Sequence, residues 1–138
     1  MKHLFILLFF IPLCICSIYD IKKRIIPNYL VAIILLTGII NSIMYHSHSH
    51  LILGALFPSF PLLILRFKSK YPGFGDIKLL SAVGTWLGWT LNFYVFILAC
   101  ILSLAFVFIY KLITNKQLKS VAFAPFILMA VVSLYFFY

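Results

Sequence analysis

Residues 71–80 read Tyr-Pro-Gly-Phe-Gly-Asp-Ile-Lys-Leu-Leu. In this stretch a glycine-rich segment is followed by an aspartate, and the aspartate directly precedes a long apolar run. The 138-residue chain contains only two acidic residues, Asp76 in this stretch and Asp20. Each lies where an apolar run meets a basic segment. A carboxylate at the edge of a bilayer is costly in free energy, so one that is kept there is a candidate for function. We therefore expect the two aspartates to act as a pair.

The composition is typical of an integral membrane protein. Hydrophobic residues make up 65% of the chain and charged residues 9%, and the mean hydropathy is +1.19. Because about a quarter of the residues in soluble domains are charged, we expect one membrane-embedded domain over residues 1–138. The net charge of +9 comes from short basic clusters between apolar runs. This pattern favours cytoplasmic loops beside a lipid bilayer over a nucleic-acid-binding surface.

Successive apolar runs predict an all-α, polytopic membrane protein with about six transmembrane helices. The runs are residues 4–19, 29–45, 51–65, 77–89, 93–110 and 121–138. Pro58 and Pro61 are expected to kink or break the third run, and residues 88–92 to turn between the fourth and fifth. The first run could also be a signal peptide. No small-residue cleavage site follows it, so we expect a retained helix.

The basic residues predict the orientation of the chain. Of the eleven lysines and arginines, all but Lys2 lie in or beside the loops after the first, third and fifth runs. The positive-inside rule places these loops in the cytoplasm and both chain ends outside. Asp20 and Asp76 then lie on the same cytoplasmic face. The alternating histidines of residues 46–50 lie on the opposite face, where a solvated turn is expected in preference to a metal site.

Two carboxylates that share one water can hydrolyse a peptide bond. They cannot easily both ionise, so one keeps a proton while the other acts as a base toward the water. The acid then protonates the carbonyl oxygen or the leaving amine. The sequence leaves open which aspartate is acid and which is base. Gly73 and Gly75, just before Asp76, allow unusual backbone conformations and the close approach of a substrate strand.

These motifs resemble those of one family. Asp20 followed by Ile26-Pro27-Asn28, and the segment Gly73-Phe74-Gly75-Asp76-Ile77-Lys78-Leu79-Leu80, are similar to the type IV prepilin peptidases, GxGD-type aspartic proteases of the cytoplasmic membrane. Residues 123–126, Phe-Ala-Pro-Phe, resemble the motif in that family's last helix, although Ala122 and Ala124 stand where many members have Pro and Gly.

The resemblance implies that Asp20 and Asp76 are the catalytic pair. It also implies cleavage of the short basic leader of prepilin-like substrates at the cytoplasmic face, without a metal or another cofactor. Further residues in the motifs are expected to bind substrate or shape the loops: Pro27, Asn28, Gly73, Phe74, Gly75, Lys78 and Pro125. Lys78 is expected either to reach the lipid headgroups or to contact substrate.

Three points complete the expectations from the sequence. The chain lacks the paired CxxC motifs that accompany N-methylation in larger family members, so it resembles the compact peptidase-only members. One alternative function is a small proton- or cation-coupled transporter that uses the aspartates, although transporters usually place such acids near mid-membrane. Another is a non-catalytic assembly protein in which the aspartates cap helices. The oligomeric state stays open.

Overall fold

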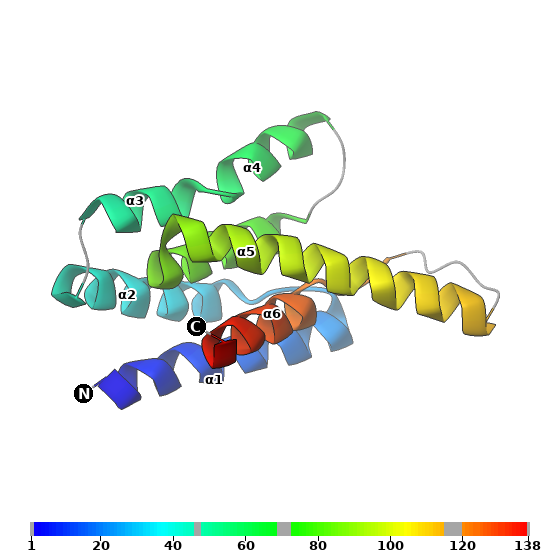
Figure 1. Ribbon diagram of the computed structural model, residues 1–138, viewed down its shortest axis with the longest axis horizontal. Coiled ribbons are helices and arrows are strands. Elements are labelled where there is room, and N and C mark those ends of the chain that lie inside the picture. Colours follow the sequence, from blue (N-terminus) through cyan, green and yellow to red (C-terminus); the bar gives the residue numbers. More distant parts are fainter. Residues whose placement is uncertain (1, 46–47, 69–72, 115–119, 138) are drawn as a thin grey trace.

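The computed structural model describes residues 2–45, 48–68, 73–114 and 120–137, and this part of the chain is helical apart from short connections (Figure 1). The helices are α1 (Lys2–Lys23), α2 (Asn28–Tyr45), α3 (His48–Leu56), α4 (Ser59–Lys68), α5 (Phe74–Thr114) and α6 (Ala124–Phe137). The prediction of an all-α fold is confirmed. α1 is longer than the apolar run that predicted it, and it includes Asp20 in its last turn.

The third apolar run forms two helices. α3 ends at Leu56 and α4 begins at Ser59, so the chain breaks at Pro58, as predicted. Pro61 lies in the first turn of α4, where a missing N–H leaves no hydrogen bond unmade.

The histidine-rich segment is helical from His48 onward. His48 begins α3, so the expected turn over residues 46–50 was wrong from residue 48 onward, and residues 46–47 lie outside the described residues. A helix satisfies backbone polar groups beside a bilayer better than a long loop does. Among the residues whose side chains the structure describes, which do not include His48 and His50, no group of three or more His, Cys, Asp or Glu could hold a metal ion.

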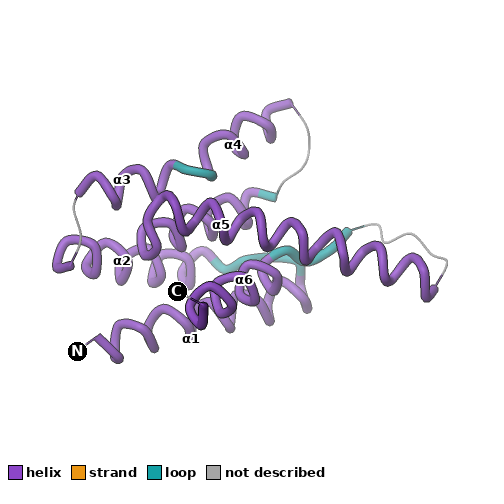
Figure 2. Tube along the Cα trace, viewed as in Figure 1, coloured by secondary structure: helices purple, strands orange, loops and turns teal. Residues whose placement is uncertain are grey.

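α5 folds back on itself at Gly88. This residue has φ 77° and ψ 175°, a backbone conformation that is largely closed to residues with a Cβ. Twelve residues of straight helix span about 18 Å. The side-chain amide of Asn92 nevertheless donates a hydrogen bond of 3.0 Å to the carbonyl of Leu80. The chain therefore reverses direction within the segment predicted to turn (Figure 2).

α3 packs closely against the reversed part of α5. The amide nitrogen of Asn92 also contacts the carbonyl oxygens of Gly54 and Phe57, at 3.2 and 3.0 Å. A Cβ atom on Gly84 would overlap the carbonyl oxygen of Gly54, so neither helix could approach the other with larger residues at this crossing. These contacts fix the hairpin and thereby the direction in which the start of α5 points.

The end of α1 and the starts of α5 and α6 lie on the same side of the molecule. Figure 1 shows that α1 ends, and α5 and α6 begin, to the right of centre, with the N-terminus on the left and the last part of α5 running on past them to the far right. The segments that carry Asp20 and Asp76 thus share this side. This is the relative arrangement that the loop order predicted.

The outer surface of the bundle is apolar. α5 is long and apolar enough to cross a membrane, and shorter apolar helices cover residues 28–44, 51–67 and 124–137. Large apolar side chains such as Phe67, Ile113 and Phe137 are 84%, 77% and 91% exposed. Such a surface is expected to face lipid. The number of membrane spans stays a prediction.

Candidate active site

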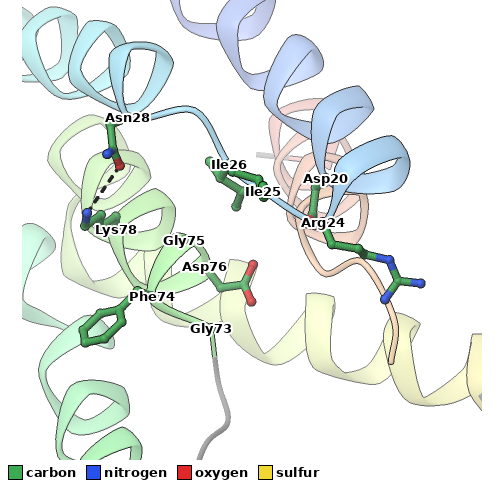
Figure 3. Close-up of a pocket in the computed structure, with 10 residues that line it drawn as sticks. All are labelled: Asp20, Arg24, Ile25, Ile26, Asn28, Gly73, Phe74, Gly75, Asp76 and Lys78. Atoms are coloured by element: carbon green, nitrogen blue, oxygen red, sulfur yellow. Dashed lines mark hydrogen bonds between the residues drawn. The ribbon is translucent and has the colours of Figure 1, made fainter. Parts of the chain in front are cut away.

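A pocket of about 330 Å³ lies between the end of α1, the segment that leads to α2, and the start of α5 (Figure 3). It brings together Asp20 from α1 and Asp76 from α5. The residues that line it are Asp20, Arg24, Ile25, Ile26, Asn28, Gly73, Phe74, Gly75, Asp76 and Lys78. The two acids of the sequence therefore share one pocket.

Asp20 is held by the N-terminus of α6. Its side chain is 6% exposed, and its Oδ2 accepts a hydrogen bond of 2.9 Å from the backbone N–H of Ala124, the first residue of α6. The first N–H groups of a helix lack intrahelical partners, and the helix dipole favours an anion there. The N-terminus of α6 thus offsets the unfavourable position of Asp20 at the C-terminal end of α1.

Asp76 is held by the N-terminus of its own helix. The carbonyl of Gly73 accepts a hydrogen bond of 3.3 Å from the N–H of Ile77, which makes Gly73 the N-cap of α5. The carboxylate of Asp76 reaches back and accepts the N–H of Gly73. An acidic residue three positions after the N-cap makes the same contact in a capping box.

Two helix N-termini therefore converge on the pocket, each with a carboxylate as its acceptor. Asp20 and Asp76 are close enough for the charge of one to act on the other. A backbone N–H donor on each carboxylate fixes its orientation, while the pocket has room for water beside both. Hydrolysis of a peptide bond requires an acid and a base, and a pair of carboxylates held beside one water can act as both.

Arg24 also lines the pocket, although the sequence motifs did not predict it there. Its N–H donates to the carbonyl of Asp20 at 3.0 Å and its φ is 56°, which ends α1 with a left-handed residue. Its guanidinium donates a hydrogen bond to the hydroxyl of Ser120, just before α6. The basic cluster directly after Asp20 was a signal for this residue, but it was interpreted only as a marker of orientation.

Asn28, Phe74 and Lys78, which were expected to bind substrate or shape loops, line the pocket. Lys78 Nζ donates a hydrogen bond of 3.3 Å to Asn28 Oδ1 across the pocket, a contact the sequence did not predict. The guanidinium of Arg66 lies 3.9 Å from the centre of the Phe74 ring. Both contacts tie the start of α5 to neighbouring helices.

Gly75 lines the pocket for a different reason from the one expected. Gly75 lies inside α5 and its φ is not in the left-handed region, so the predicted backbone freedom is wrong for this residue. A Cβ atom at Gly75 would lie 3.2 Å from the side chain of Ile26, so its small size lets the two segments approach. The first turn of a helix needs no unusual backbone angles, whereas the close contact with Ile26 needs a residue without a side chain.

The two prolines do not line the pocket. Pro27 directly precedes α2, and its carbonyl accepts the N–H of Val31 at 3.4 Å. Pro125 lies in the first turn of α6, next to the N–H that contacts Asp20. Each proline thus shapes a helix start beside the pocket.

Comparison with known proteins gives a family match over the part of the chain that contains Asp20 and Asp76. The profile of the type IV leader peptidase family matches residues 7–108. The prepilin leader peptidase/N-methyltransferase of Pectobacterium carotovorum subsp. carotovorum is 29% identical over 122 residues, which cover 82% of this chain and 44% of that protein. The chain thus spans less than half the length of this relative. No solved structure matches this chain.

Proposed function

This chain belongs to the type IV leader peptidase family and is a membrane protein, and we propose that it is an aspartic endopeptidase for the short basic leaders of prepilin-like proteins. Cleavage would take place at the cytoplasmic face of the membrane. The observation that carries the proposal is the shared pocket of Asp20 and Asp76, in which each carboxylate accepts a backbone N–H from a helix N-terminus.

The proposed reaction uses one water and no cofactor. The ionised aspartate takes a proton from the water, and the water oxygen bonds to the carbonyl carbon of the scissile peptide. The protonated aspartate gives its proton to the leaving nitrogen as the C–N bond breaks. The products are a free carboxylate end and a free amine end, and the proton taken from water restores a singly protonated pair.

The surroundings of the pair suit a substrate that leaves the membrane at this point. Ile25 and Phe74 form an apolar rim and are 65% and 50% exposed. The pocket lies where α1 ends and α5 begins, beside the basic residues Arg24 and Lys78, and a leader would join its apolar helix at this point. Transport of an ion would favour carboxylates half-way along the helices, so this position supports hydrolysis.

The substrate class is tested with purified protein in detergent and two prepilin-like substrates that share one apolar helix. One substrate carries a basic leader and the other a neutral leader of equal length. We expect cleavage at the junction of leader and helix in the first substrate and slower cleavage in the second. Equal cleavage of both would contradict recognition of a basic leader, and cleavage of neither would contradict the proposed activity.

A further inference from the structure

The segment between α1 and α2 crosses the pocket without regular structure. Residues 25–27 are not helical, and Ile25 and Ile26 both line the pocket. In the part of the chain that the structure describes, the backbone N–H and C=O groups of these two isoleucines make no hydrogen bond. Unpaired backbone groups beside a bilayer are costly unless water or a ligand satisfies them.

Both ends of this segment are fixed. Arg24 anchors one end through its left-handed turn and its hydrogen bond to Ser120. At the other end, Pro27 restricts Ile26 to extended backbone conformations. The side chain of Ile26 is 8% exposed and packs against Gly75, one residue before Asp76. The free backbone groups are therefore held in place beside the candidate catalytic pair.

We propose that the backbone of Ile25 and Ile26 is a substrate-binding edge that pairs with an extended segment of the cleaved polypeptide. The inference rests on the proposed function and adds to it how the substrate is held. A helical substrate must unwind before its peptide bond can be attacked, and the freed N–H and C=O groups then need partners. Pairing with an exposed edge supplies them. The exposed side chain of Ile25 would contact an apolar residue of the substrate.

The pairing predicts a pattern that depends on position in the substrate. In an extended segment, the N–H and C=O of one residue point to the same side and those of the next residue point away. Only one of the two isoleucines can therefore offer both groups to the substrate. A single substrate N–H near the scissile bond should be paired, while its immediate neighbours point elsewhere.

The test is a scan with synthetic substrate peptides in which one amide at a time is replaced by an ester. The ester removes an N–H donor and keeps the side chain. The scissile amide itself is not replaced. At one other position we expect kcat/KM to fall roughly five- to tenfold, and at the flanking positions we expect it to change less than about twofold. Equal values at all positions would overturn the inference. An uncleaved all-amide peptide would instead overturn the proposed function, and the inference with it.

Variants of the edge test the same pairing from the protein side. Ile25→Pro and Ile26→Pro each remove one N–H, and Ile25→Ala and Ile26→Ala are matched controls that keep it. We expect one of the two proline variants to lose about tenfold more kcat/KM than its alanine control. Two folded proline variants as active as their controls would contradict the inference. Where a proline variant does not fold, the ester scan decides.

Discussion

The Oδ2 of Asp20 accepts a hydrogen bond from the backbone N–H of Ala124, so an aspartate on α1 caps the first turn of α6. This contact gives Asp20 a structural function in addition to the catalytic one proposed for it. The two functions can be separated, because an asparagine at this position keeps an acceptor oxygen but cannot ionise.

The cap predicts different stabilities for two variants of Asp20. Asp20→Ala should lower the free energy of unfolding by about 1 kcal/mol or more, since the N–H of Ala124 loses its acceptor in a buried position. Asp20→Asn should stay close to the wild type. Thermal unfolding in detergent measures both, and equal melting temperatures for the alanine and asparagine variants would contradict the cap.

The turn at Gly88 predicts a second effect on stability. Gly88→Ala places a Cβ on a backbone with φ 77° and ψ 175°, which should cost about 1–3 kcal/mol. Thr90→Ala, at an exposed helical position two residues on, is the control and should change stability little. If the two variants unfold at the same temperature, the reversal of α5 at Gly88 is wrong.

The orientation in the membrane can be read with reporter fusions. The positive-inside rule predicts a cytoplasmic signal for fusions after Lys23, Lys68 and Thr114. Fusions after Tyr45 and Phe137 should give an external signal. Two or more reversed reporters would contradict the predicted topology.

Metal removal should leave proteolysis unchanged. The residues that line the pocket include two carboxylates but no His or Cys, whereas catalytic zinc usually has three protein ligands. The measurement is the cleavage rate before and after treatment with EDTA. A loss of activity that zinc restores would require a different mechanism.

The sequence predicted the partners in the pocket better than it predicted their contacts. Asp20 and Asp76 could be paired because loop order and charge place both on one face of any six-span bundle. The contact with Ala124 could not be predicted, since it depends on how the start of α6 docks against α1. The break at Pro58 and the turn near Gly88 follow from local backbone chemistry, and both were predicted from it.

Two other features had a signal in the sequence that was not used fully. Asn92 was interpreted only as a turn residue, although an amide in an apolar run needs hydrogen-bond partners, and here its nitrogen contacts three carbonyls. Gly75 was expected to provide backbone freedom, but it provides space for Ile26. The room available at Gly75 depends on Ile26, which is distant in the chain, and local sequence patterns do not reveal such a contact.

The cleavage rates of Asp20→Asn, Asp76→Asn and the double variant test whether Asp20 and Asp76 form one catalytic pair. Measured on a prepilin-like substrate alongside thermal stability, each single variant should lose at least about 100-fold in kcat. The double variant should be no slower than either single one, because residues that act as a unit are not additive. All three should remain folded. A folded single variant with near-wild-type turnover would contradict the claim.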